Sequence, residues 1–274
     1  MKGIDLRQSK EYQNYMKRLG WQVEKGMFIK KLWWLPWSMI KIQRQNNLKQ
    51  AEVTKISKKH RALLVKIEPA IDDKTNYEKW GFKLDKSPLL PTKTIWIDLK
   101  KSQSRLLKEM HHKTRYNIKK HKRRDVKILR GDKIDKKTLE SFFEIYKQNC
   151  KEQKYWGLGF KQIEHLVKAF SDKAYLLWVK NLGGLIVTTY KGVVYYAHNG
   201  ASKQGKKEFL PTILAWEAIK LGRKLGCKKF DFEGVVDERF KVTRKWLGFS
   251  RFKKSFGGDT IEYMGSFSKK GVNL

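Results

Sequence analysis

Cysteine is nearly absent from this sequence. Cys150 and Cys227 are its two cysteines among 274 residues. Two such distant cysteines make neither a disulfide framework nor a metal-binding motif. We interpret both as buried or incidental thiols of a protein in a reducing cytoplasm, and we expect no metal ion and no cofactor.

Long apolar runs are absent too. The most apolar early stretch, residues 27–42, is interrupted by Lys30, Lys31, Pro36 and Lys41. It is too short and too charged to span a bilayer. The opening letters MKGIDLRQSK lack the apolar core of a signal peptide. We therefore expect a cytoplasmic protein whose contact with a membrane, if it has one, is peripheral at the inner face.

An aromatic cluster lies inside that stretch. The letters WWLPW (residues 33–37) connect two expected strands, 21–34 and 38–44. Such a cluster can anchor a protein at a membrane interface. The alternative, which the sequence favours slightly, is a hairpin whose tryptophans pack into a core.

Acidic residues are scarce relative to basic ones. The sequence has 27 Asp and Glu against 62 Lys and Arg, which gives a formal net charge of +35. Such an excess favours polyanionic partners, either nucleic acid or anionic lipid. A basic proteome is another source of this excess, so the charge alone does not identify the partner. Apolar residues make up 40% of the chain, ten of them Trp, so a folded core is expected.

One basic stretch is the strongest candidate for contact with phosphates. Residues 103–122, QSRLLKEMHHKTRYNIKKHK, show loose helical spacing of apolar residues surrounded by Lys and Arg. A solvated helix face is the simpler interpretation of one basic helix. The basic character of the rest of the chain favours a phosphate-rich partner.

The expected elements form two similar series. Each runs helix, antiparallel strands, helix, strand, and they are separated by a break near Pro88 and Pro91. This mixed order predicts an α+β fold. The expected helices are 9–19 (with Ser9 as N-cap), 46–60, 135–152, 160–170 and 208–225. The expected later strands are 95–99, 126–129, 174–180, 184–190, 193–198, 229–232, 251–256 and 260–267.

Three segments near the C-terminus carry a recognisable pattern. They read YAHNGAS, FLPTILAWEAIKLGRKLGCKKFDFEG and FSRFKKSFGGDTIEYMG, within residues 196–265. The pattern resembles the FemABX family of aminoacyl-tRNA-dependent peptidyltransferases, and weaker similarity extends over nearly the whole chain. The resemblance implies two tandem GNAT-like acyltransferase domains with mixed sheets and no long helical arm. We place them at 1–91 and 92–264, with 265–274 packing back onto the first.

The resemblance also implies a reaction. An amine of the peptidoglycan stem peptide, on a UDP-linked or lipid-linked precursor, attacks the ester carbonyl of an aminoacyl-tRNA, so that an interpeptide bridge begins. Two alternatives remain open: a tRNA-dependent aminoacyltransferase with a protein or lipid acceptor, and a non-catalytic RNA-binding module of the same fold. We expect a monomer.

The residues themselves are consistent with such a reaction. An aminoacyl ester is already activated, so the protein needs no nucleophile, and the sequence has no G-x-S-x-G elbow. The step needs a positive group near the developing oxyanion, a route for the amine proton and an orienting pocket.

Site residues follow from the resemblance. It assigns Lys253, on an expected strand, as the key lysine near the tRNA acceptor end; by charge alone Lys254 is its rival, and a solvated strand lysine is the alternative for either. Glu68 is the candidate acceptor of the amine proton, with a solvated carboxylate as its alternative. Lys17, Tyr196 and His198 are candidates for substrate binding, although a structural histidine is the favoured alternative for His198. The basic residues expected to contact tRNA are Arg115, Lys119, Lys120, Arg123 and Lys254.

One departure from the family pattern concerns the proton acceptor. Ser266 follows Gly265 where members often carry an acidic residue. A carboxylate base at that point is therefore absent from this chain.

Overall fold

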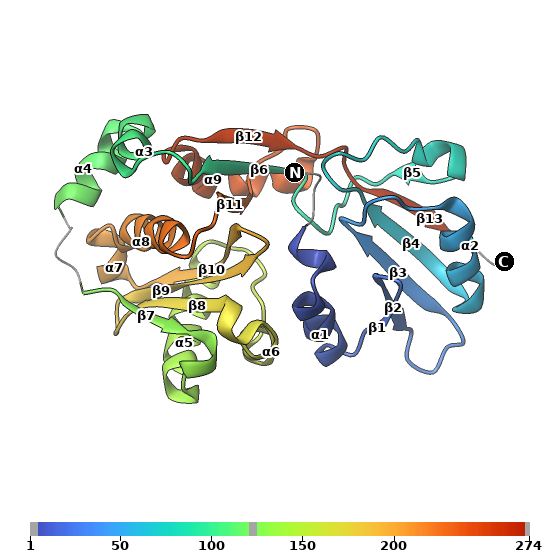
Figure 1. Ribbon diagram of the computed structural model, residues 1–274. Helices are drawn as coiled ribbons and strands as arrows, with labels where there is room; N and C mark the ends of the chain where they lie inside the picture. The colour runs from blue at the N-terminus through green and yellow to red at the C-terminus, as the bar shows by residue number, and fades with distance from the viewer. Residues whose placement is uncertain (1–4, 121–124, 272–274) are drawn as a thin grey trace. The chain divides into compact units, whose positions relative to one another are not determined.

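The computed structural model describes residues 5–120 and 125–271, which divide into two compact units. Unit 1 contains the chain up to Lys93, together with Gly234–Leu247 and the segment from Ile261 onward. Unit 2 contains Thr94–Glu233 and Gly248–Thr260. Each unit has its own mixed sheet, so the expected α+β class is confirmed (Figure 1).

Unit 1 is built on a six-stranded sheet of order β1-β2-β3-β4-β13-β5. Its strands are β1 (Gln22–Glu24), β2 (Met27–Lys31), β3 (Ser38–Gln43), β4 (Ala62–Glu68), β5 (Lys83–Leu84) and β13 (Phe267–Lys270). Strands β3 and β4 are parallel, and the other pairs are antiparallel. Because β13 pairs with both β4 and β5, the end of the chain completes the sheet that its beginning starts.

Two helices accompany this sheet, α1 (Lys10–Arg18) and α2 (Gln50–Lys59). Helix α1 begins where the sequence predicts, because the Ser9 side chain accepts a hydrogen bond from the backbone N–H of Tyr12 at 3.0 Å. Buried residues from the sheet and α2, among them Ile40, Val65 and Ile56, form one hydrophobic cluster. Burial of such side chains is what stabilises elements this short.

Unit 2 is built on a seven-stranded sheet of order β12-β6-β11-β10-β9-β8-β7. Its strands are β6 (Lys93–Asp98), β7 (Lys127–Arg130), β8 (Ala174–Val179), β9 (Gly183–Tyr190), β10 (Val193–Ala201), β11 (Lys229–Gly234) and β12 (Asp259–Glu262). Its helices are α3 (Gln103–Glu109), α4 (His112–Lys120), α5 (Lys136–Glu152), α6 (Phe160–Phe170), α7 (Lys203–Lys207), α8 (Leu210–Lys224) and α9 (Leu247–Lys254).

Short 3₁₀ turns occur in both units, at Leu6–Gln8, Tyr77–Trp80, Gly131–Lys133, Ser171–Lys173 and Lys241–Trp246.

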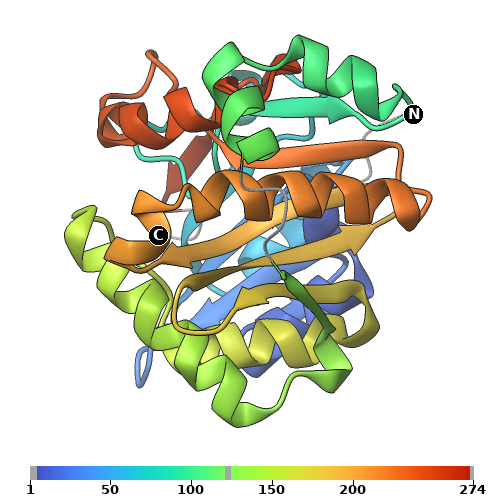
Figure 2. The same cartoon turned by 90° about the vertical axis from the view of Figure 1, so that its left-hand side faces the viewer.

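Helices cover both faces of this sheet: α8 lies on one side and α5 and α6 on the other (Figure 1), and α8 runs along the sheet (Figure 2, orange). Two glycines allow this close packing. A Cβ at Gly222 of α8 would lie 2.7 Å from the Val194 side chain, and one at Gly200 of β10 would lie 2.7 Å from the Tyr146 backbone of α5. In the described part of the chain, no helix is both long enough and apolar enough to cross a membrane. The longest described helix, α5, has 17 residues, so these residues contain no long helical arm.

The predicted basic helix at 103–122 is two helices. It breaks at Met110 and His111, between α3 and α4. The Arg115 guanidinium stabilises the break, because its Nη1 donates to the carbonyl oxygens of Lys108 (2.8 Å) and Met110 (3.0 Å) at the end of α3.

The predicted strand at 251–256 is wrong. Residues 251–254 form the end of helix α9, and residues 255–256 form the turn that follows it. Phe249, Lys253 and Phe256 recur at helical spacing; Lys253 and Phe256 are buried, and Phe249 is half-buried beside Lys253. The aromatic residues suggested a strand, but the helix ends at Lys254, and Gly257 and Gly258, both with positive φ, follow it before β12.

The interpretation of WWLPW as a buried hairpin is also wrong. Strands β2 and β3 do form a hairpin. The side chains of Trp33 and Trp34 are, however, 88% and 80% exposed.

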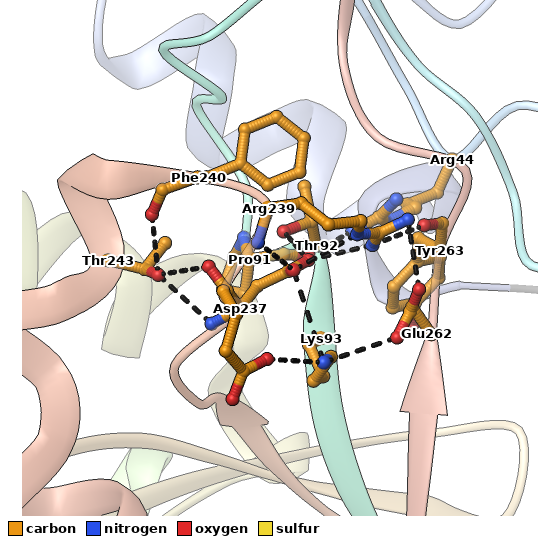
Figure 3. Close-up of polar contacts among 11 residues, drawn as sticks. Arg44, Pro91, Thr92, Lys93, Asp237, Arg239, Phe240, Thr243, Glu262 and Tyr263 are labelled. Carbon is orange, nitrogen blue, oxygen red and sulfur yellow. Dashed lines mark hydrogen bonds and ion pairs between the residues drawn. The ribbon is translucent and has the colours of Figure 1, made fainter.

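Residues 234–247 belong to unit 1, although the sequence placed them in the second domain. A polar cluster holds them there (Figure 3). The buried carboxylate of Asp237 accepts hydrogen bonds from the Thr92 hydroxyl (2.6 Å) and from Arg239 (2.7 Å), and Arg239 also pairs with Glu262 at 3.0 Å. Lys93 pairs with Glu262 at 3.2 Å. Contacts between residues some 145 positions apart leave no local signal in a sequence.

Candidate active site

The centre of unit 2 contains a place where two parallel strands separate. Strands β10 and β11 are paired in register from Val193–Lys229 to Tyr195–Asp231. Strand β10 then has an irregularity between Tyr196 and His198. Strand β11 turns at Glu233, whose φ of +58° is rare for a residue with a side chain. The two strands therefore part beyond Tyr195 and Asp231.

Lys253 of α9 lies at this point. Its ammonium group is 5.6 Å from the ring centre of Tyr196 and 5.3 Å from that of Phe249. The residue is only 8% exposed, whereas the next lysine, Lys254, is exposed. The neighbouring Phe256 packs on Phe232 of β11, with ring centres 5.2 Å apart, so the helix is anchored to the sheet. The lysine head is therefore held in place by its surroundings.

Burial has a strong effect on the charge of this lysine. It lowers the pKa of Lys253 to about 8, and the negative charges of Glu233 and Asp231 oppose part of that effect. Lys253 is still mostly charged at pH 7, and it can exchange a proton near physiological pH. A lysine with such properties suits a fixed cation or a proton donor.

Asp231 is the buried carboxylate beside this lysine. Burial, reinforced by the charge of Glu233, raises its pKa to about 6. Three groups fix its position: the Thr94 hydroxyl, the Trp96 indole N–H at 2.9 Å and the Glu233 backbone N–H at 2.7 Å. Asp231 could not be singled out from the sequence, because an aspartate in the middle of a strand has no distinguishing local pattern.

Of the two predicted substrate-binding residues on β10, Tyr196 lies beside Lys253, with its ring centre 5.6 Å from the ammonium group. His198 packs edge-on against Tyr146 of α5, with ring centres 5.6 Å apart. Burial lowers the pKa of His198 to about 4, so its ring is neutral at pH 7. Its assignment to substrate binding stays a prediction.

The basic helices are attached to the segment that carries Lys253. The Ser255 carbonyl oxygen accepts a hydrogen bond from the His111 backbone N–H at 2.9 Å, and the Ser255 hydroxyl accepts one from Thr114 at 2.8 Å. Lys119 and Lys120 are exposed on α4. An anion bound along α4 would therefore lie on an element directly tied to α9.

The predicted tRNA contacts differ in their surroundings. Arg115 is half-buried and its Nη1 is engaged by the end of α3. Lys254 is exposed at the end of α9. Arg123 lies outside the described residues.

In unit 1, Glu68 ends strand β4 and is buried. One carboxylate oxygen accepts the backbone N–H groups of Leu89 (2.6 Å) and Leu90 (2.5 Å), and the other accepts the Gln43 side chain at 2.8 Å. This geometry gives Glu68 a positioning role, in which it holds residues 89–90 against the ends of β3 and β4. Its assignment as the proton acceptor stays a prediction, as does that of Lys17, which is exposed on α1.

A second lysine cluster in unit 1 was missed from the sequence. Lys41 of β3 lies 4.3 Å from the ring centre of Trp21, and Lys30 lies 6.0 Å from the same ring. Burial lowers the pKa of Lys41; Glu68 opposes this effect, and the like charges of Lys66 and Lys30 add to it. Clustered like charges next to an aromatic ring are a candidate anion site. No linear motif joins residues 21, 30 and 41, so strand pairing was needed to find it.

No three histidine, cysteine or acidic side chains of residues 5–120 and 125–271 gather in a way that could hold a metal ion.

Comparison with known proteins identifies the sequence pattern and the fold. Residues 178–273 match the model of the FemAB family, which confirms the resemblance seen in the sequence. The comparison with curated proteins gives no match.

Among solved structures, the chain is similar to FemX, with a TM-score of 0.78 and 16% identity over 98% of this chain and 92% of that one. It is also similar to the C-terminal domain of a putative lysylphosphatidylglycerol synthetase from Agrobacterium fabrum (TM-score 0.68, 10% identity, 96% and 88% covered). A tandem GNAT protein from the clavulanic acid biosynthesis pathway matches with a TM-score of 0.56 and 10% identity over 92% and 82%. The fold is thus the predicted pair of GNAT-like domains.

Proposed function

We propose that this protein is an aminoacyltransferase that extends the stem peptide of a peptidoglycan precursor with an amino acid taken from aminoacyl-tRNA. The match of residues 178–273 to the model of the FemAB family supports this proposal. The observation that carries the proposal is the buried, aromatic-flanked Lys253 at the separation of β10 and β11. A charge held in such a site is costly, so the protein must gain something from it.

Lys253 supplies the electrostatic part of the reaction. The acceptor amine forms a bond to the ester carbonyl carbon, and negative charge develops on the carbonyl oxygen. The ester C–O bond then breaks, the amine nitrogen loses a proton as the amide forms, and the terminal tRNA oxygen leaves with a proton in exchange. A preorganised ammonium group stabilises the developing charge without having to reorganise. With a pKa of about 8, Lys253 is also able to return a proton to the leaving oxygen.

Asp231 and Glu233 act through Lys253. Their negative charge favours the charged form of the lysine and thereby offsets part of the desolvation. Without them, burial alone would leave less of the lysine charged at neutral pH.

The basic helix α4 binds the tRNA in this proposal. Its exposed lysines neutralise backbone phosphates, and its hydrogen bonds to Ser255 connect it to the helix of Lys253. Phosphate contacts of this kind position a nucleic acid without reading its sequence, which suits an enzyme that accepts a tRNA by its acceptor end.

The lysine cluster of unit 1 binds the phosphates of the precursor in this proposal. Both a UDP-linked and a lipid-linked precursor carry phosphates, and Lys41 and Lys30 provide positive charge beside the flat ring of Trp21. Lys41 is the principal candidate for binding the precursor's phosphates.

The experiment that tests the reaction combines the protein with a mixture of charged tRNAs and one acceptor at a time. The acceptors are a UDP-linked stem peptide, a lipid-linked stem peptide and phosphatidylglycerol, and mass spectrometry detects added residues. We expect an added residue on a stem peptide. Modification of phosphatidylglycerol alone would replace the acceptor, and tRNA binding without transfer to any acceptor would contradict the proposal.

A further inference from the structure

The connection between β2 and β3 presents two tryptophans to solvent. Trp33 and Trp34 are 88% and 80% exposed, and their rings lie 5.3 Å apart, tilted by 47°. Leu35 is 39% exposed beside them. Adjacent tryptophans exposed to this degree leave a large apolar surface in water, which is unusual unless it is covered by a partner.

The backbone of residues 33–35, which we call the tip, is held in a strained conformation. Trp33 has a φ of +51°, a region that bulky residues rarely adopt. Two hydrogen bonds close the loop, from the Leu32 N–H to the Trp37 carbonyl and from the Leu35 N–H to the Leu32 carbonyl, both at 2.9 Å. Strain kept by surrounding structure at an exposed aromatic residue is a sign of function.

Strand register places a rim of positive charge at the same end of the sheet. Lys31 is paired with Ser38, Ser38 with Ala62, and Lys270 with Leu64. The tip connects Lys31 to Ser38, so it extends beyond the strand ends where β4 begins (Figure 1). We define the rim as four exposed cations at this end: Lys31, Lys58, Arg61 and Lys270.

Acidic residues are absent from the segments that form this end. Residues 31–38, 58–64 and 268–270 contain no Asp or Glu. Glu24 reaches the neighbouring Lys59 and His60, each at 2.8 Å, so we leave these two outside the rim.

We infer that the tip (residues 33–35) and its rim form a docking surface for an anionic lipid bilayer. Tryptophan side chains favour the boundary between lipid headgroups and acyl chains, and lysine and arginine beside them attract anionic headgroups. The tip supplies the first part of this combination and the rim supplies the second.

A nucleic acid base fits the tip less well. A base stacked between two rings needs them about 7 Å apart, twice the spacing of stacked bases. Trp33 and Trp34 are 5.3 Å apart and not parallel, so they leave no slot for a base.

The test uses the whole protein with vesicles of phosphatidylcholine alone or of phosphatidylcholine and phosphatidylglycerol in equal parts, some made with brominated acyl chains. The parent protein should bind the anionic vesicles, and the bromine should quench its tryptophan emission. Quenching separates insertion from the attraction that a charge of +35 produces anyway. Binding without quenching, or no binding, would overturn the inference.

Matched variants locate the contact. The Trp33→Ser/Trp34→Ser double variant should bind about tenfold more weakly and lose the quenching. Trp156→Ser removes a 98% exposed tryptophan from unit 2 and should change neither. Neutralising one rim residue, as in Arg61→Gln, should weaken binding about fivefold. Quenching that survives in the double variant, or tip fluorescence that responds to RNA instead of vesicles, would refute the assignment.

This docking does not depend on the proposed reaction. Transfer to a soluble acceptor should be unchanged in the double variant, so failure of the vesicle experiment leaves the assignment of Lys253 intact.

Discussion

Replacement of Lys253 by Met should make the protein more stable at pH 7. Burial lowers the lysine pKa from 10.5 to about 8, which corresponds to roughly 3 kcal/mol of destabilisation of the charged form. Met keeps the length of the side chain and removes this cost. It loses about 1 kcal/mol of cation–π attraction to Tyr196 and Phe249, and its sulfur regains part of that against the same rings. We expect a net gain of about 2 kcal/mol.

The gain should depend on pH in a defined way. The folded-state pKa of Lys253 lies below its unfolded value, so between pH 8 and 10.5 the unfolded state binds more protons than the folded state. The contribution of Lys253 to stability therefore rises with pH across this window. The advantage of the Met variant should be constant below about pH 8 and shrink toward pH 10.5.

The assay is urea unfolding of the parent protein and the variant at a series of pH values. Lys254→Met is the control, because Lys254 is exposed and its replacement should change stability by less than about 0.5 kcal/mol at any pH. A Lys253→Met protein that is less stable than the parent, or whose stability difference does not vary with pH, would refute the account of a buried, destabilising charge.

Three further predictions concern activity and binding. The transfer rate should fall as pH rises through about 8, where Lys253 loses its proton, and Asp231→Asn should move this fall to lower pH, as measured in a rate–pH profile. The Lys119→Gln/Lys120→Gln variant should reduce the log–log slope of tRNA affinity against salt by about one for each phosphate that the variant no longer neutralises, in a filter-binding titration; an unchanged slope would place the tRNA elsewhere. Lys41→Met should raise the KM for the precursor and leave kcat nearly unchanged in steady-state assays, and a fall in kcat alone would exclude precursor binding as its role.

Local signals explain which parts of the fold were predictable. The start of α1 follows from Ser9, whose side chain caps the helix, and helices α5 and α6 follow from their apolar periodicity. Such features depend on residues close in sequence, so they were predicted correctly.

Errors arose where distant contacts decide the local structure. At the break between α3 and α4, the His111 backbone N–H donates to the carbonyl oxygen of Ser255, which lies far along the chain, at 2.9 Å. Residues 251–254 are helical although phenylalanine favours strands. The packing of Phe256 on Phe232, a residue distant in sequence, stabilises this arrangement.

The candidate site was predictable only in part. The family pattern indicated Lys253, and the structure shows that this lysine, rather than Lys254, faces the interior. Asp231, which lies beside it, and the pair of Lys41 and Trp21 depend on strand register, which composition and periodicity do not specify.

The central claim, that Lys253 stabilises the charge developing in acyl transfer, is tested most directly by single-turnover transfer from aminoacyl-tRNA at pH 7. Lys253→Met should lower the rate constant about a hundred- to a thousand-fold, the usual cost of losing one preorganised donor, while circular dichroism stays that of the parent and Lys254→Met transfers at nearly the parent rate. A Lys253→Met protein that is folded, binds tRNA and transfers as fast as the parent would contradict the account.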